Sequence, residues 1–268
     1  MFSELNSILN ASPESCPQGE FILVSDRKAD ASFLIHHFLS FYLRAGCKVC
    51  FLGLVQSFSH YSAVGHRLGV SLAQARDKGQ LVFLEGLKDA LGILLQDGTS
   101  SGAHTLDFLS SPRSDLRRVF EFVQGSMSGS EVAEWGPPVL IVDDLTVLLS
   151  LGVRAGAVLD FAHYCRAFVC SKQQGNMVIL VRGEDEEEDD GDEEGSEWLL
   201  KGLTHQCSLA LRVEGLPTGY CKDIHGQVEV CWWGCSRGVG GPQRKLFQYK
   251  VHDKGASFFA RGTSSAVL

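Results

Sequence analysis

The sequence contains no apolar run that approaches the roughly 18 to 20 residues needed by a membrane-spanning helix. Residues 1–11 carry neither a positively charged stretch nor a long apolar core, so we expect no secretory signal. The mean hydropathy of +0.03 also argues against a membrane protein. We therefore expect a globular chain without a membrane partner.

Metal-binding cysteine motifs are also scarce, although the chain holds nine cysteines. Cys47 and Cys50 form a C-x-x-C, but no second C-x-x-C or H-x-H follows at zinc-finger spacing. Cys50 lies in a run typical of a strand, where residues three apart face opposite sides of the sheet. Cys231 and Cys235 flank a Trp-Trp pair at a strand end and lead to the same conclusion. We therefore predict no metal ligands, and free thiols in a reducing compartment.

The net charge of -8 comes from one segment. Ten of the 32 acidic residues lie in residues 184–194, and the other 22 nearly balance the 24 lysines and arginines, which leaves +2. Like charges this dense cannot be buried, so we expect residues 183–195 to form a solvated, disordered loop. A second hypothesis is that this loop screens a basic surface against non-specific RNA. The near-neutral remainder neither supports nor excludes such a surface.

The most informative stretch has the layout of a phosphate-binding loop. An apolar strand is predicted at residues 21–24, and apolar residues at helical spacing predict a helix at residues 31–44. A strand, a polar turn and a helix in this order are typical of loops that wrap phosphates with backbone N–H groups.

The residues that such a loop needs are missing. When G-x-x-x-x-G-K-S/T is placed on the turn, Ser25 and Asp30 replace its glycines and Ala31 replaces its lysine, so that only Ser32 fits. Asp30 would also put a negative charge where a phosphate binds, and Lys28 lies on the wrong side of the turn. We therefore predict a nucleotide-hydrolase scaffold that has lost its nucleotide site, and no cofactor-binding residue.

A second hydrolase-like motif ends in two acids. Residues 138–142 form an apolar strand, and Asp143 or Asp144 would orient Mg²⁺ or a water in an active enzyme. Beside the incomplete loop, we interpret the pair as part of the scaffold. We expect the two acids to cap the following turn or to accept backbone N–H bonds, and we assign no catalytic residue.

Adjacent histidines in the helix after the turn give no ligand pair. His36 and His37 point in different directions, because neighbouring residues of a helix do not converge. We expect both to be surface or half-buried side chains.

The remaining pattern alternates strands and helices, then turns β-rich. Further strands are predicted at residues 48–55, 80–84 and 177–181, and further helices at residues 60–68, 112–123 (with Ser111 as N-cap), 154–169 and 198–207. Residues 97–103, 125–135 and 237–242 are expected loops, the last a Gly-rich hairpin. Period-2 alternation predicts antiparallel, half-exposed strands at residues 208–213, 228–232 and 247–251.

This order of elements defines an α/β fold class. Strand–helix alternation through residue 181 predicts a mainly parallel central sheet flanked by helices, which the antiparallel C-terminal strands widen. That is the architecture of RecA-like ATPase cores. We expect residues 1–268 to form one such domain, with residues 1–19 as a leader.

Three segments carry a resemblance to a known family. They read V-S-D-R-K-A-D-A-S (residues 24–32), P-P-V-L-I-V-D-D-L (residues 137–145) and E-V-C-W-W (residues 229–233). In this order and spacing, the whole chain resembles the family of the sixth subunit of the Elongator complex.

The resemblance implies a RecA-like subunit without nucleotide-binding motifs. It implies a hetero-hexameric ring with two copies each of subunits 4, 5 and 6, attached to the rest of Elongator. Elongator modifies the wobble uridine of certain tRNAs at carbon 5, and the ring is implicated in binding and releasing tRNA. The radical chemistry belongs to another subunit, so no enzymatic activity and no cofactor are implied here. The implied location is the cytoplasm, with the nucleus as a second location.

The resemblance also suggests where partners bind. In a ring of RecA-like units the phosphate-loop face of one subunit meets its neighbour, so our hypothesis is that Asp30, Arg27 and Lys28 contact an adjoining subunit. Arg237, Arg244 and Lys245 are candidates for tRNA phosphate contacts.

Two functions from other classes stay open. One is an ATPase or kinase with an atypical phosphate loop that uses Lys28 and Asp143. The other is a binding module similar to recombinase paralogues, acting in DNA repair. Nucleotide binding by the isolated chain would favour the first, and co-purifying partners would separate the second.

Overall fold

The computed structural model describes residues 2–86, 88, 116–127, 135–183, 195–216, 219, 221–233 and 243–260. Several expectations lie outside these residues. They concern the loop at residues 97–103, the helix start at Ser111, the acidic residues 184–194, and Cys235 and Arg237 in residues 234–242.

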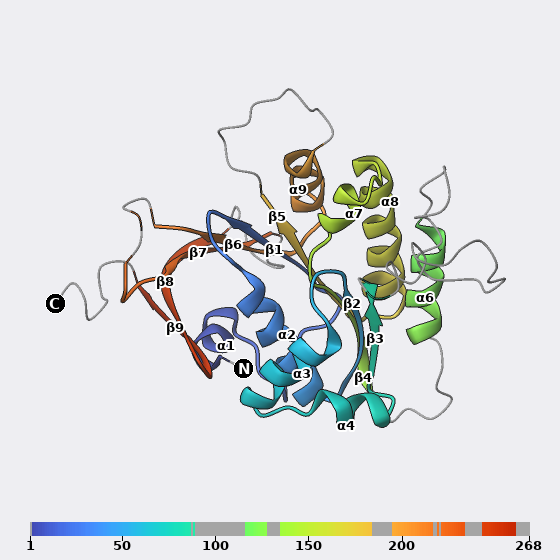
Figure 1. Cartoon of the computed structure of the whole chain (residues 1–268), viewed down its shortest axis with the longest axis horizontal. Coiled ribbons are helices and arrows are strands. Elements are labelled where there is room, and N and C mark those ends of the chain that lie inside the picture. Colours follow the sequence, from blue (N-terminus) through green and yellow to red (C-terminus); the bar gives the residue numbers. More distant parts are fainter. Residues whose placement is uncertain are drawn as a thin grey trace.

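A nine-stranded sheet connects the described parts of the chain (Figure 1). Its order is β3-β2-β4-β5-β1-β6-β7-β8-β9. The strands are β1 (Phe21–Arg27), β2 (Cys47–Gly53), β3 (Leu81–Glu85), β4 (Gly136–Val142), β5 (Asn176–Arg182), β6 (Leu209–Glu214), β7 (Gly226–Trp232), β8 (Gln243–His252) and β9 (Gly255–Ala260). Strand β1 lies between β5 and β6. The turn that follows it at residues 28–31, called the emptied turn because it lacks the phosphate-binding residues, is therefore near the middle of the sheet.

Helices cover both faces of the sheet (Figure 1). One face packs against α1 (Ser3–Leu9), α2 (Ser32–Arg44), α3 (Phe58–Arg67) and α4 (Leu72–Asp77). The other packs against α6 (Arg117–Met127), α7 (Val147–Ser150), α8 (Ala155–Arg166) and α9 (Ser196–Thr204), and α8 continues as a π-helix over Ala167–Lys172.

Strand β1 shows why a doubly covered strand reads as a continuous apolar run. Ile22 and Val24 join the hydrophobic cluster under α2, whereas Phe21 and Leu23 join the cluster under α8. Because both faces are buried, residues 21–24 are all apolar and no alternation appears. The same reasoning explains Cys47 and Cys50 of β2, which lie in the two different clusters as predicted.

The fold class is confirmed, with one correction to the C-terminal strands. β6 pairs in parallel with β1 and antiparallel with β7, so the antiparallel part begins one strand later than expected. The reason is helix α9, which carries the chain back across the sheet before β6 starts, and such a crossover produces a parallel pair. The sequence analysis also missed α4, α7 and β9.

The first helix and the last described strand meet in the fold. Helix α1 packs against β9, and the Phe2 and Phe258 rings lie 6.4 Å apart. Glu4 accepts the backbone N–H of Phe258, a group on the outer edge of the last strand. Leu5 is fully buried. The segment expected to be a leader thus contributes to the core.

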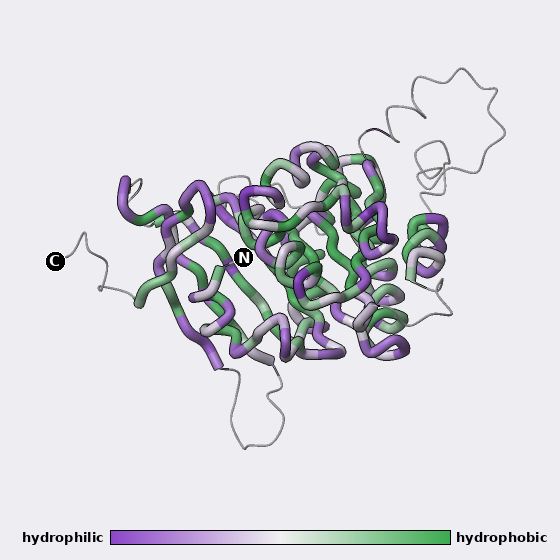
Figure 2. Tube along the Cα trace, turned by 90° about the horizontal axis from the view of Figure 1, so that it is seen from below, coloured by the Kyte–Doolittle hydropathy of each residue, from purple (hydrophilic) through white to green (hydrophobic). Residues whose placement is uncertain are grey.

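Hydropathy follows this layering. In Figure 2 the chain is most hydrophobic in the middle of the molecule and more hydrophilic toward the C-terminal strands. The first four residues of β8 are exposed. None of the helices in the described ranges is both long and apolar enough to cross a bilayer.

Candidate functional site at the emptied phosphate turn

The turn after β1 lies at the carboxyl end of parallel strands, where open α/β sheets bind their ligands. β1 ends at Arg27, Lys28 adopts a left-handed conformation with a φ of 52°, and α2 begins at Ser32. The strand, turn and helix predicted from the sequence are therefore present. The chemistry of this turn depends on where its backbone N–H groups point.

Two carboxylates of the chain itself accept these N–H groups. Asp26 Oδ2 accepts the backbone N–H of Ala31 at 3.0 Å. Asp30 Oδ1 accepts the backbone N–H of Ser32 at 2.9 Å, and Asp30 Oδ2 lies 2.9 Å from the Ser32 hydroxyl. These amides open helix α2, where the helix dipole favours an anion. The carboxylates thus occupy the positions in which a phosphate-binding loop holds phosphate oxygens.

A single guanidinium joins three carboxylates in front of the turn. Arg182, at the end of β5, lies 3.1 Å from Asp26 Oδ2 through Nη1, 3.0 Å from Asp144 Oδ2 through Nε and 3.6 Å from Asp30 Oδ1 through Nη2. The side chains of Asp26 and Asp144 are 3% and 5% exposed, and those of Arg182 and Asp30 are 40% and 66% exposed. The centre of the site is therefore an ion-pair network. Its inner carboxylates, Asp26 and Asp144, are buried, and its outer groups, Arg182 and Asp30, are more exposed.

The proton affinities in this network follow from burial and charge. Burial raises the pKa of Asp26, while the Ala31 amide and the Arg182 charge act in the opposite direction. Burial acts to lower the pKa of Arg182, but Asp26, Asp144 and Asp30 outweigh it and raise that pKa. The guanidinium thus stays charged, and an incoming phosphate would meet three carboxylates.

Asp143 is fully engaged in holding a neighbouring loop. Its Oδ1 accepts the N–H of Leu54 at 2.7 Å, and its Oδ2 accepts the N–H of Val55 at 3.1 Å. The Tyr61 hydroxyl also donates to Oδ2, at 3.0 Å. Burial raises the pKa of Asp143 to about 6. These bonds confirm the prediction that the acid accepts backbone N–H groups.

Asp144 caps the turn that follows β4. Its Oδ1 accepts the backbone N–H of Thr146 at 2.9 Å and also contacts the Thr146 hydroxyl. Thr146 Oγ1 in turn accepts the N–H of Arg182 at 3.0 Å. The two acids that could have oriented Mg²⁺ therefore tie β4 to its neighbours, as the sequence analysis expected.

The cationic residues predicted to contact partners differ in their surroundings. Arg27 pairs with Glu197 of α9 and is therefore engaged within the chain. Lys28 is exposed and makes no hydrogen bond or ion pair in the described part of the chain. On β8, Arg244 and Lys245 are exposed and lie over the Trp233 and Trp232 rings at 5.9 and 5.6 Å.

The sequence analysis missed the central member of the network. Arg182 follows the predicted strand at residues 177–181, and its position at the carboxyl end of a parallel strand next to an Asp-ending strand was a usable signal. Asp26 and Tyr61 carried no comparable signal, because their partners Arg182 and Asp143 come from distant segments.

One prediction about the histidines is wrong. His37 is only 1% exposed, and its Nδ1 accepts the backbone N–H of Phe2 at 2.9 Å. Burial lowers its pKa to about 3, so the ring is neutral. His36 is partly buried, as expected.

Among the residues that the structure describes, no group of three or more His, Cys, Asp and Glu side chains could hold a metal ion, and their cysteines are all free.

Comparison with solved structures assigns the class of fold. The uncharacterized protein PH0321 from Pyrococcus horikoshii superimposes with a TM-score of 0.62 at 12% identity, over 96% of each chain. The KaiC-like protein PH0186 of the same organism gives 0.52 at 10% identity, over 92% of each chain. The protein therefore has a RecA- and KaiC-like fold whose phosphate turn is closed by its own carboxylates.

Comparison with sequences assigns the family. The profile of the family described as "Elongation complex protein 6" matches residues 2–253. Curated relatives named Elongator complex protein 6 are 69% identical in Danio rerio and 53% identical in Homo sapiens, in both cases over the full length of both chains. A Dictyostelium discoideum relative of the same name is 25% identical and covers 85% of this chain. The chain belongs to the Elongation complex protein 6 family, and membership in the Elongator complex follows from that.

Proposed function

We propose that the chain is a non-catalytic subunit of Elongator that assembles with subunits 4 and 5 into a hetero-hexameric RecA-like ring. In this proposal the ring supports modification of the tRNA wobble uridine at carbon 5 by binding and releasing tRNA. The proposal places the chain in the cytoplasm, with the nucleus as a second location.

The observation that carries this proposal is the occupied phosphate turn. The amides of Ala31 and Ser32 already bond Asp26 and Asp30, so the turn has no free donors for a triphosphate at these positions. The network around Arg182 adds negative charge at the same place. A RecA-like unit that cannot hold nucleotide at this face has the face available for a neighbouring subunit.

A calorimetric titration of the isolated chain with Mg²⁺-ATP tests the loss of nucleotide binding. We expect no saturable heat at millimolar ATP. Saturable binding, together with ATP located over residues 25–32, would revive the ATPase or kinase hypothesis and overturn the proposal.

Co-expression with subunits 4 and 5, followed by native mass spectrometry, tests the assembly. We expect a complex with two copies of each chain, which binds tRNA in an anisotropy titration. Partners of a recombination complex in place of subunits 4 and 5 would favour the DNA-repair hypothesis.

Charge reversal tests whether the turn faces a neighbour. We expect Asp30→Lys to weaken assembly, because the side chain is largely exposed at the rim of the site. Asp253→Lys is a matched control on the exposed turn between β8 and β9. Thermal unfolding of both isolated variants separates a local effect on Arg182 from an effect on assembly. A normal ring with Asp30→Lys would contradict the interface hypothesis.

A further inference from the structure

A cavity of about 310 Å³ lies at the opposite end of β1 from the emptied turn. Ile22 near the start of β1 and Leu209 at the start of β6 form part of its lining, as do Phe38 and Tyr42 in the second half of α2. Because β1 has seven residues, the two ends of the strand are separated by about 20 Å. The cavity is therefore distinct from the site described above.

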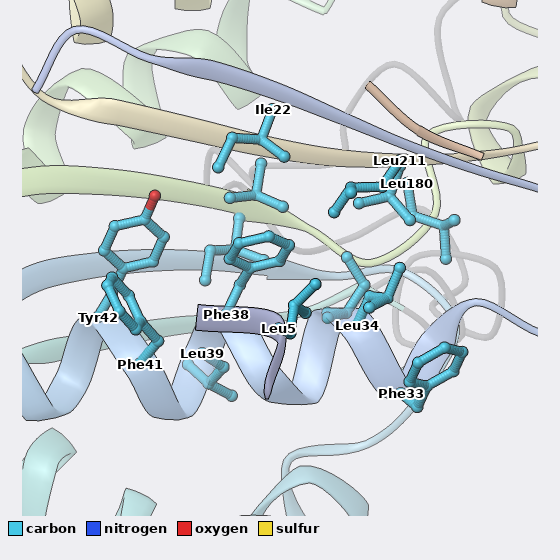
Figure 3. Close-up of a cluster of buried hydrophobic side chains, with 14 of the residues drawn as sticks. Leu5, Ile22, Phe33, Leu34, Phe38, Leu39, Phe41, Tyr42, Leu180 and Leu211 are labelled. Atoms are coloured by element: carbon cyan, nitrogen blue, oxygen red, sulfur yellow. The ribbon is translucent and has the colours of Figure 1, made fainter. Parts of the chain in front are cut away.

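Aromatic rings form much of the cavity wall. Phe38, Phe41 and Tyr42 come from α2, and Trp232 and Trp233 come from the end of β7. The Tyr42 ring is fixed by its neighbours, since it stacks on Phe38 at 6.3 Å and meets Phe41 edge-on at 5.3 Å. Figure 3 shows the Tyr42 ring rising from α2 toward the sheet with its hydroxyl at the tip. Rings held in this way offer flat apolar surfaces to a ligand.

Several polar groups around the cavity have no partner in the described part of the chain. Tyr42 is only 3% exposed, yet its hydroxyl makes no hydrogen bond there. Asn6 Oδ1 and Trp233 Nε1 are also buried without a partner. Buried polar groups in folded proteins are nearly always hydrogen-bonded, so the unpaired Tyr42 hydroxyl beside the cavity indicates an occupant that accepts a hydrogen bond.

These groups define the chemistry of that occupant. Burial raises the pKa of Tyr42, so its hydroxyl remains protonated and can donate. Glu20 also lines the cavity and accepts a hydrogen bond from Ser208, so its carboxylate disfavours an anion. A neutral ligand with a hydrogen-bond acceptor fits these features.

The size of the cavity agrees with that chemistry. An engineered apolar cavity of about 150 Å³ binds benzene. A hollow of about 310 Å³ has room for a fused two-ring molecule, and it lies at the lower end of the range for small-molecule sites.

We propose that this cavity binds a small, uncharged, planar heteroaromatic molecule, with Tyr42 donating to a ring nitrogen. The proposal goes beyond the proposed role in Elongator and does not depend on ring assembly.

Two probes of nearly the same shape test it on the full chain by titration calorimetry. Indole carries a ring N–H, and 7-azaindole adds an adjacent ring nitrogen that can accept from Tyr42. We expect both to bind, and 7-azaindole to bind about 3- to 10-fold more tightly, the range for one neutral hydrogen bond. Tyr42→Phe should abolish this difference and leave indole binding in place.

Two further variants complete the test. Tyr164→Phe makes the same chemical change on a tyrosine that is 60% exposed, and it should keep the preference for 7-azaindole. Ala11→Phe should fill the cavity and abolish binding of both probes, with folding checked by circular dichroism. The proposal is overturned if neither probe binds at millimolar concentration, which would indicate a water-filled cavity. It is also overturned if Tyr42→Phe retains the preference, and this comparison stands even if Ala11→Phe does not fold.

Discussion

Replacement of Arg182 by methionine removes the one positive charge shared by Asp26, Asp30 and Asp144. Methionine keeps the length and the apolar stem of the side chain, so that the change is mainly electrostatic. Asp26 and Asp144 then remain buried with negative charges that lack their ion pair. We expect a clear loss of stability in the isolated chain.

The size of that loss follows from the burial of the partners. Removing one member of a buried ion pair costs about 3–5 kcal/mol, whereas exposed pairs contribute about 0–1 kcal/mol. The carboxylates are almost fully buried but the Arg182 side chain is 40% exposed, so solvent screens part of the interaction. We therefore expect the free energy of unfolding to fall by about 2–3 kcal/mol at neutral pH, between these limits.

The loss should depend on pH in a defined direction. Burial already raises the pKa of Asp26, and removal of the Arg182 charge raises it further. A carboxyl group with a higher pKa in the folded state favours folding at low pH, and this contribution disappears as the pH rises through the folded-state pKa. The deficit of Arg182→Met should therefore be largest at neutral pH and shrink as the pH falls toward the ordinary Asp value of 3.8.

Urea unfolding at pH 7.5 and pH 5 measures both effects. Arg154→Met is a matched control, because Arg154 is exposed and makes no ion pair in the described residues. The reasoning is refuted if Arg182→Met costs no more than the control, or if its deficit is the same at both pH values.

Three further predictions concern other groups. Asp143→Asn should lower the free energy of unfolding by about 1–3 kcal/mol, because an amide nitrogen replaces one of the oxygens that accept the Leu54 and Val55 amides. In the wild type, NMR titration should place the Asp143 pKa near 6, and this residue's contribution to stability should decline as the pH rises from about 4 to about 6, a decline absent in Asp143→Asn. If Arg244 and Lys245 contact tRNA phosphates, the double alanine variant should reduce the salt dependence of tRNA binding by the assembled ring by about two ion equivalents. The control variant with Lys78→Ala and Lys254→Ala should not change it. An unchanged slope of affinity against salt concentration in the first variant would show that neither Arg244 nor Lys245 contacts tRNA. Deletion of residues 184–194 should leave specific tRNA affinity unchanged if the segment is a spacer, and a rise in non-specific RNA binding would support the screening hypothesis instead.

The local sequence pattern was sufficient to predict strands and helices where burial alone decides the residue type. The runs in β1, β2 and β4 are apolar because both faces of these strands are covered, and helix α2 is rich in apolar residues because ten of its thirteen residues are buried. The missing glycines and lysine of the turn were likewise readable, because phosphate binding needs particular residues at fixed spacing.

Other features depend on contacts between distant segments. β1 continues through Ser25 and Asp26 to Arg27, although these residues are polar, because β5 and β6 pair with it. His37 is buried because an amide 35 residues away bonds its ring. Helix α4 has only six residues, with Leu72 and Ala75 buried, and so short a segment gives no periodic signal. A sequence pattern cannot show partners of this kind before the topology is known.

The contact between α1 and β9 sets an order on synthesis. Because β9 is synthesised long after α1, the N-terminal helix can contact α2 early but cannot complete its docking until about residue 260 has left the ribosome. Until then the side of α1 that faces β9 stays uncovered, and a nascent chain in this state offers an apolar segment to chaperones. Removal of α1 or of β9 would leave the same gap, because each covers the other.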